Sequence, residues 1–135
     1  MGAGRSTATK TLTGLAQLGM SGGMLIYKIL SRPQWDAFRL AGATFGAPVD
    51  LADGYVHFSA APQLAETAAR HFADQSDLVL LAFDANRLGP ALKWEPSRGG
   101  ALFPHLYRAL LLDEVLWDKS LPLGATGHIF PEGVF

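Results

Sequence analysis

The sequence predicts an α+β domain in which antiparallel strands dominate. Two helical segments, at about 32–41 and 60–73, come early in the chain, and several short strand-like segments follow. Too few helices separate these later strands to supply the crossovers that parallel pairing requires. The chain has 135 residues, of which 49% are hydrophobic and 17% are charged, so it is long and apolar enough to bury one core. We therefore expect a single domain over residues 24–135.

The N-terminal residues 1–23 differ in composition from the rest of the chain. They are rich in Gly, Ser, Thr and Ala, and glycines interrupt the mildly hydrophobic stretch from Leu12 to Met20. No signal-peptide core forms there, and the longest apolar runs elsewhere fall far short of the roughly 20 residues of a membrane helix. We interpret residues 1–23 as a flexible extension of a soluble, cytoplasmic protein with no membrane partner.

Charge and cysteine content narrow the function classes. The chain has 11 Lys and Arg against 12 Asp and Glu, and this formal charge of -1 supplies no basic field for general nucleic-acid binding. The absence of cysteine removes disulfides, thiolate nucleophiles and cysteine-based metal sites. Histidine, aspartate and glutamate are the remaining candidates for metal ligands.

Local signals mark the first strand and the first helix. Residues 24–30 form a β-branched and aromatic run of strand length. Ser31 and Gln34 have the spacing of a capping box, and Gly42 is the expected stop of the helix over 32–41. The residues of this helix predicted to face the core are Trp35 and Phe38.

The next segments are predicted from turn and helix signals. Residues 50–54 have the composition of a turn, and Ser59 is placed to cap a helix from about residue 60 to residue 73. Apolar residues recur every four positions on the predicted buried side of this helix, at Leu64, Ala68 and Phe72.

Four strand-like segments follow. The nearly continuous apolar run 77–83 predicts a central strand that is covered on both faces. In residues 92–95 the alternation sends Glu95 toward a pocket. Residues 103–107 contain a proline and are expected to form an edge strand or an extended segment, and residues 115–117 a last strand.

The segment Gly54–Ser59 carries the strongest functional signal. If it is one strand, period-two alternation places Tyr55, His57 and Ser59 on one face, and an apolar face lies opposite. The same spacing groups His105 and Tyr107 in the later segment. These side chains predict a polar edge of a pocket.

Four ordered motifs resemble those of the small bacterial family called domain of unknown function 952. They are Gly54–Ser59 followed by Gln63, residues 77–81, Trp94-Glu95, and residues 103–107. The resemblance covers most of the chain from residue 24 to about 117. That family is grouped with the ADP-ribosyltransferase-like fold, so the resemblance implies small split antiparallel sheets, accompanied here by two helices, with NAD in the cleft between the sheets.

The resemblance also implies roles for single residues. In NAD-using members of the wider fold, a histidine bonds a ribose hydroxyl and a serine two residues later bonds the nicotinamide amide, and His57 and Ser59 are similar to that pair. The residue between them is usually glycine, whereas this chain has Phe58. Glu95 is the candidate catalytic carboxylate, together with His57. The candidate NAD-binding residues are Tyr55, His57, Ser59, His105 and Tyr107.

These residues leave more than one function open. The resemblance implies binding of NAD or a related nucleotide, with NAD as co-substrate of an ADP-ribosyltransferase-like transferase. The alternative is a non-catalytic module that binds a nucleotide or a small metabolite. His57, His105 and Glu95 are also metal-ligand types, but they lack a compact signature, and we expect no metal.

Each residue has a structural interpretation as well. His57 can be a hydrogen-bonded residue at a sheet edge, and Ser59 can be a helix cap. Glu95 can pair with Lys93 on a solvated face. The sequence does not choose between these interpretations, and it indicates no protein partner.

Overall fold

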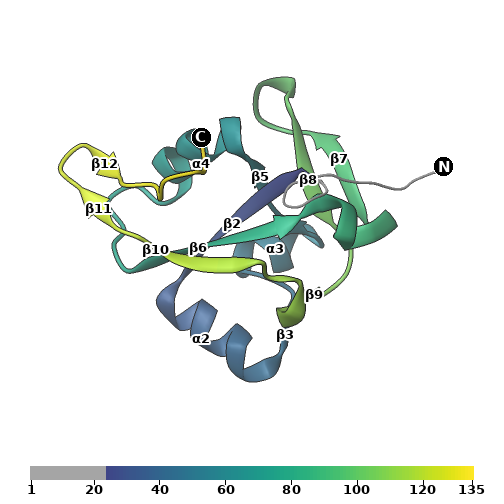
Figure 1. The fold of residues 1–135 in the computed structure, drawn as a ribbon. Coiled ribbons are helices and arrows are strands. Elements are labelled where there is room, and N and C mark those ends of the chain that lie inside the picture. Colours follow the sequence, from purple (N-terminus) through teal and green to yellow (C-terminus); the bar gives the residue numbers. More distant parts are fainter. Residues whose placement is uncertain (1–23) are drawn as a thin grey trace.

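The computed structural model describes residues 24–135 of the chain (Figure 1). The predicted extension, residues 1–23, lies outside the described residues. The elements follow in this order: β2 (Leu25–Ser31), α2 (Arg32–Ala41), β3 (Ala43–Thr44), α3 (Pro48–Asp53), β4 (Val56–His57), β5 (Ser59–Ala60), α4 (Ala61–His71), β6 (Leu78–Asp84), η1 (Ala85–Ala91), β7 (Leu92–Pro96), η2 (Arg98–Gly100), β8 (Leu102–Leu106), β9 (Leu110–Leu111), η3 (Leu112–Glu114), β10 (Trp117–Leu121), β11 (Leu123–Gly124) and β12 (Gly127–His128).

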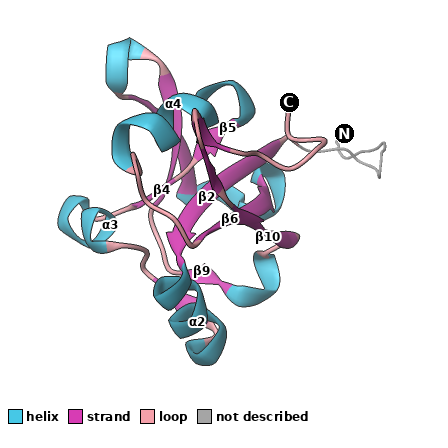
Figure 2. Ribbon diagram, turned by 90° about the vertical axis from the view of Figure 1, so that its left-hand side faces the viewer, coloured by secondary structure: helices cyan, strands magenta, loops and turns pink. Residues whose placement is uncertain are grey.

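A four-stranded antiparallel sheet forms the centre of the fold. Its strand order is β10-β6-β2-β5, and β6 pairs with β2 along its whole length. Every residue of β6 except Asp84 is buried, so the prediction of a central strand covered on both faces is confirmed. Figure 2 shows α4 and α2 on opposite sides of these strands. The predicted α+β class with several small antiparallel sheets is likewise confirmed.

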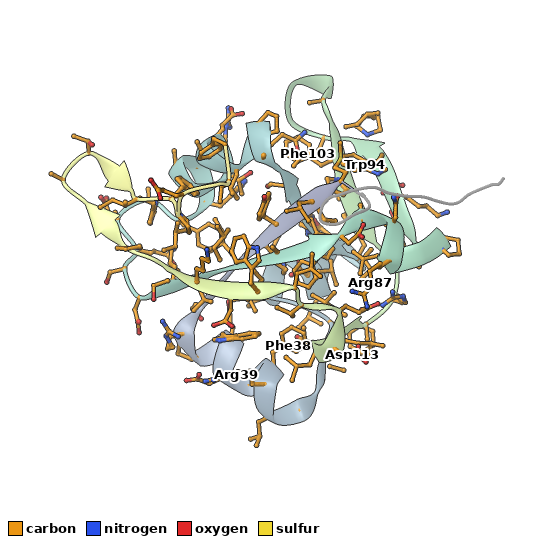
Figure 3. The ribbon with its side chains drawn as sticks, viewed as in Figure 1. Phe38, Arg39, Arg87, Trp94, Phe103 and Asp113 are labelled. Atoms are coloured by element: carbon orange, nitrogen blue, oxygen red, sulfur yellow. The ribbon has the colours of Figure 1, made fainter. Side chains whose placement is uncertain are left out.

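Alternation along β2 and β6 divides the core into two clusters, one on each face of the sheet. On one face lie α2 and the strands β4 and β8, with the buried side chains Ile26, Leu30, Trp35, Phe38, Val56, Phe58, Val79, Leu81, Phe83, Leu88, Leu106 and Leu110. On the other face lie α4 and the C-terminal segment, with Tyr27, Ile29, Leu64, Ala68, Leu78, Leu80, Ala82, Leu121 and Val134. Figure 3 shows Phe38 below the sheet and Trp94 on the β7–β8 hairpin, where Trp94 is exposed.

A second antiparallel sheet has three strands in the order β4-β8-β7. The strand β8 is central in it, so the prediction of an edge strand at residues 103–107 was wrong. Pro104 is accommodated because its N and C=O groups point toward β4, where the pairing is about to end. Its carbonyl accepts the N–H of Phe58 at 3.0 Å, and β4 itself stops at His57.

The first helix has the boundaries that the sequence predicts. The hydroxyl of Ser31 accepts the N–H of Gln34 at 3.3 Å, and Oε1 of Gln34 accepts the N–H of Ser31 at 2.9 Å. Gly42 follows the helix in the left-handed conformation, with φ of 82°. These reciprocal contacts satisfy two donors that an uncapped helix leaves without partners.

Two predicted boundaries were wrong. Residues 50–53, expected to be part of a turn, form the last four residues of the helix α3, with Pro48 in its first turn and Gly54 as its left-handed C-cap. The N-cap of α4 is Ala60 rather than Ser59, and Oε1 of Gln63 accepts the Ala60 N–H at 3.0 Å.

The later part of the chain adds the strand β10 to the edge of the four-stranded sheet. The last predicted strand, at residues 115–117, begins at Trp117 and runs to Leu121 as β10. A short hairpin of β11 and β12 follows, and Val134 then packs into the core under α4. Within residues 24–135, no helix is long and apolar enough to cross a membrane.

Candidate functional site

The segment Tyr55–Ser59 is not one continuous strand. Residues up to His57 pair with β8 in the three-stranded sheet, and from Ser59 onward the chain pairs with β2 in the four-stranded sheet. The chain therefore passes from the three-stranded sheet to the four-stranded sheet at Phe58. Val56 and Phe58 lie together in one core cluster, as period-two alternation predicts, and Ser59 pairs in a different sheet from His57.

Ser59 belongs to the core rather than to the candidate site. Its side chain lies in the four-stranded sheet, only 4% exposed, and its hydroxyl lies 2.8 Å from the Thr67 hydroxyl of α4. The predicted site residues that the fold brings together are instead Tyr55, His57, Glu95, His105 and Tyr107.

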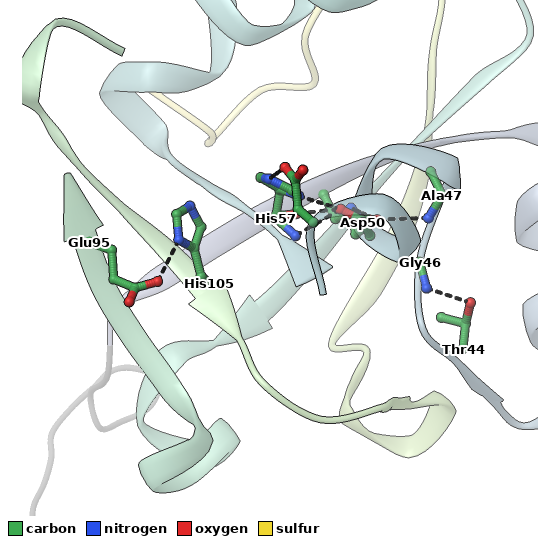
Figure 4. Close-up of polar contacts among 9 residues, drawn as sticks. Thr44, Gly46, Ala47, Asp50, His57, Glu95 and His105 are labelled. Atoms are coloured by element: carbon green, nitrogen blue, oxygen red, sulfur yellow. Dashed lines mark hydrogen bonds and ion pairs between the residues drawn. The ribbon is translucent and has the colours of Figure 1, made fainter. Parts of the chain in front are cut away.

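A buried carboxylate, Asp50, fixes the position of His57 (Figure 4). Its Oδ1 atom accepts the backbone N–H of His57 at 3.0 Å and lies 2.6 Å from Nδ1 of the ring. Its Oδ2 atom accepts the N–H of Ala47 at 2.7 Å and forms an ion pair with Nζ of Lys28 at 2.8 Å. Lys28 also donates to the backbone oxygen of His57 at 2.9 Å. Both side chains of the ion pair are almost fully buried.

The electrostatics of this centre favour a charged carboxylate. Burial by itself would raise the pKa of Asp50, but the hydrogen bonds from His57 and the charge of Lys28 outweigh burial and lower the pKa to about 2. Burial lowers the pKa of Lys28, and the charge of Asp50 opposes that effect. Gly46 passes so close that a side chain there would collide with the Asp50 carboxylate, which explains a glycine at this position.

The second ring nitrogen of His57 also has a carboxylate partner. Nε2 lies 3.0 Å from Oδ2 of Asp53, at the end of α3, and the His57 side chain is 30% exposed. The ring is therefore held between Asp50 and Asp53, one buried and one exposed. Both aspartates belong to the helix α3, in the segment where the sequence predicts a turn.

Glu95, His105 and Tyr107 form a second polar group on the β7–β8 hairpin. Oε1 of Glu95 lies 2.8 Å from Nδ1 of His105 and accepts the hydroxyl of Tyr107 at 2.7 Å. The hydrogen bonds from Tyr107 and His105 lower the pKa of Glu95. The same bond to Glu95 raises the pKa of Tyr107 to about 12, so this phenol is a hydrogen-bond donor at neutral pH.

The four rings at this face make direct contact, and we call Tyr55, His57, His105 and Tyr107 the ring cluster. Tyr55 stacks on His105, with centroids 4.2 Å apart and planes at 30°. Its ring also lies 4.6 Å from His57 and 5.1 Å from Tyr107, and the two histidine rings are 5.2 Å apart. The two polar groups, one around Asp50 and one around Glu95, thus meet at Tyr55.

One polar atom in the ring cluster lacks a partner. Nε2 of His105 is buried and has no hydrogen-bond partner among the described residues. Because Nδ1 donates to the Glu95 carboxylate, Nε2 of the neutral ring is an acceptor. A buried polar atom of this kind is costly unless something bonds it, so this atom is a candidate contact for a ligand hydroxyl or amide.

Sequence reasoning missed Lys28, Asp50 and Asp53. The available signal was Lys28, because a lone lysine within an apolar strand implies a buried partner of opposite charge. Its partner could not be read from the sequence, since Asp50 is far along the chain. Within residues 24–135, no group of three His, Asp or Glu side chains is arranged to hold a metal ion.

Solved structures of one bacterial protein are similar to this chain. The crystal structure of protein CC0527 from Caulobacter crescentus is 58% identical to it, with a TM-score of 0.75 over 77% of this chain and 91% of that chain. The solution NMR structure of the same protein is 58% identical, with a TM-score of 0.70 over 77% of this chain and 90% of that chain. None of the curated proteins matches the chain.

A family model matches the part of the chain that contains the whole three-stranded sheet and the ring cluster. Its description is "Protein of unknown function (DUF952)", and the match spans residues 29–118, more than half of the chain. That range includes Asp50, His57, Glu95 and the whole β7–β8 hairpin. The chain therefore belongs to the DUF952 family.

Proposed function

We propose that this protein binds NAD or a related nucleotide at the ring cluster, and that Glu95 makes the site an ADP-ribosyltransferase-like transferase. The observation that carries the proposal is the Glu95 carboxylate, which two hydrogen bonds hold in its charged form beside the stacked rings. The resemblance of the motifs to the ADP-ribosyltransferase-like fold supports the choice of NAD.

The transfer itself requires one well-placed carboxylate. The bond between the ribose anomeric carbon and nicotinamide breaks, and nicotinamide leaves with the bonding electrons. The oxygen of an acceptor hydroxyl then bonds that carbon and loses its proton. Glu95 stabilises the positive charge that develops on the ribose and accepts the proton from the acceptor.

His57 and His105 supply binding contacts in this proposal. Asp50 fixes the ring of His57 through Nδ1, and a ribose hydroxyl takes the place of the exposed Asp53 carboxylate at Nε2. The orphan Nε2 of His105 gains a partner when a ligand hydroxyl or amide reaches it. Tyr55 and Tyr107 supply faces on which a planar ring can stack.

A second candidate function is a non-catalytic module that binds a nucleotide or small metabolite. Two observations favour it. Ser59 is buried and its hydroxyl is bonded to that of Thr67, so binding a nicotinamide amide would require this contact to break. Phe58 is buried edge-on against Phe83, with ring centroids 5.3 Å apart, where NAD-using relatives of the wider fold have glycine.

Titration of the whole chain tests binding. Backbone amide spectra are recorded with increasing NAD, ADP-ribose and nicotinamide, for the wild type, for His57→Ala, and for His128→Ala as a control histidine outside the site. We expect saturable shifts at Tyr55 and His105 that vanish in His57→Ala and persist in His128→Ala. An absence of shifts with all three compounds overturns the proposal.

Release of nicotinamide distinguishes the two candidate functions. Chromatography of a reaction with NAD measures it for the wild type and for Glu95→Gln, which keeps the size of the side chain. A transferase releases nicotinamide, and Glu95→Gln lowers the rate by about a hundredfold or more while still binding NAD. Binding without release by the wild type identifies the non-catalytic module.

A further inference from the structure

A small pocket adjoins the ring cluster, and Glu95 is not among the residues that line it. Its volume is about 170 Å³, and Tyr55 and Tyr107 belong to both the pocket and the ring cluster. The other residues that line it come from α3, from the loop before it and from β4 and β8: Phe45, Asp50, Leu51, Gly54, Val56, Leu106 and Arg108.

The charged groups in the wall of this pocket are already paired. Arg108 donates through Nη1 and Nη2 to the two carboxylate oxygens of Glu114, at 3.0 and 2.7 Å, and to the carbonyls of Ala109 and Leu88. Asp50 is neutralised by Lys28. An anionic phosphate would have to displace one of these contacts, so the pocket favours a neutral group.

The rim of the pocket is apolar and exposed. The side chains of Phe45 and Leu51 are 62% and 63% exposed, and that of Tyr107 is 43% exposed. Rings placed in this way stack well on a flat ligand. The volume is well below the roughly 300 Å³ at which sites for whole ligands begin, so the pocket can take one ring system but not an entire dinucleotide.

We propose that this pocket binds the neutral planar base of the nucleotide, between Phe45 and Tyr107. The inference rests on the proposed function and adds the position of one end of the ligand. Because Tyr55 and Tyr107 are shared, a ligand whose base lies in the pocket continues across Tyr55 toward His57 and Glu95. The base and the reacting ribose thus occupy opposite sides of Tyr55.

The test uses adenosine as the probe for the base and inorganic pyrophosphate as the probe for an anion. Two variants alter the pocket: Phe45→Ala removes one stacking face, and Leu51→Trp fills the space from an exposed position. Val49→Ala is the matched control, because Val49 is 58% exposed on the same helix but does not line the pocket. Amide spectra confirm that each variant is folded.

We expect adenosine to shift the signals of Gly54, Val56 and Leu106, and pyrophosphate to leave them unchanged. Phe45→Ala and Leu51→Trp should each weaken adenosine binding at least fivefold, whereas Val49→Ala should leave it within twofold of the wild type. Adenosine binding that both pocket variants leave unchanged overturns the inference. So does sedimentation that shows a dimer lost in Phe45→Ala, since a second copy of the chain would then cover this rim.

Failure of this inference can be separated from failure of the proposed function. If NAD shifts His57 and His105 but not the pocket, the base subsite is wrong and the proposed function stands. If adenosine binds in the pocket while NAD leaves His57 and His105 unshifted, the base subsite stands and the proposed function is wrong. If neither compound binds, both are wrong.

Discussion

Asp50 bonds His57 twice, once through the backbone N–H at 3.0 Å and once through ring Nδ1 at 2.6 Å, and both bonds end on the same oxygen. One buried carboxylate therefore sets both the path of the chain into β4 and the orientation of the His57 ring. Lys28 completes the arrangement by pairing with the other oxygen of Asp50. Asp50 is accordingly a positioning residue for the candidate site.

Replacing Asp50 by Asn should destabilise the fold strongly. The variant keeps the size of the side chain but leaves the Lys28 ammonium buried without a counter-charge, and loss of one partner of a buried pair costs about 3–5 kcal/mol. Urea denaturation measures the change in the free energy of unfolding. Asp36→Asn, in an exposed pair with Arg39, is the control and should change it by at most about 1 kcal/mol. Equal effects of the two variants would contradict a structural role for Asp50.

Acid should remove the contribution of Asp50. Its pKa is about 2 in the folded protein, against about 3.9 for an unfolded aspartate. Because the folded value is the lower one, the stabilisation is complete above about pH 4 and is lost as the pH falls from about 4 to about 2. A shift of this size corresponds to about 2–3 kcal/mol. The difference in unfolding free energy between the wild type and Asp50→Asn should narrow by this amount over this range; a constant difference would show that another group titrates.

Tyr107→Phe should raise the pKa of Glu95. The Tyr107 hydroxyl is the leading cause of the lowered pKa of Glu95, and the variant removes only that oxygen. Carboxyl ¹³C shifts of Glu95, followed by NMR during a pH titration, give the value directly. The control is Tyr55→Phe, which keeps both hydrogen bonds to Oε1 of Glu95. A Glu95 titration that is identical in the wild type and Tyr107→Phe would mean that this hydrogen bond does not form in solution.

Phe58→Ala should lower the free energy of unfolding by about 3–5 kcal/mol, as for other buried phenylalanines. The Phe58 side chain is 3% exposed and packs on Phe83 where the chain passes between the sheets. The control is Phe45→Ala. Because the Phe45 side chain is 62% exposed, this variant should lower the free energy of unfolding far less in the same denaturation experiment. Equal stability of the two variants would mean that the Phe58 side chain does not stabilise the core at the point where the chain passes between the sheets.

The sequence by itself determined the features that depend on neighbours along the chain. The helix α2 begins and ends where Ser31, Gln34 and Gly42 predict, because capping bonds join residues three or four positions apart. The strand β6 is central, as its unbroken apolar run predicts. The strand period groups His105 with Tyr107, and both contact Glu95 of the paired strand.

The tertiary structure alone decided the features that depend on which strands pair. Ser59 leaves the candidate site because the chain changes partner from β8 to β2 at Phe58, and Pro104 lies in a central strand because β4 ends beside it. Asp50 reaches His57 and Lys28 because α3 and β2 are brought together from distant parts of the chain. Strand pairing and burial of charge are set by contacts between distant residues, and no local spacing encodes them.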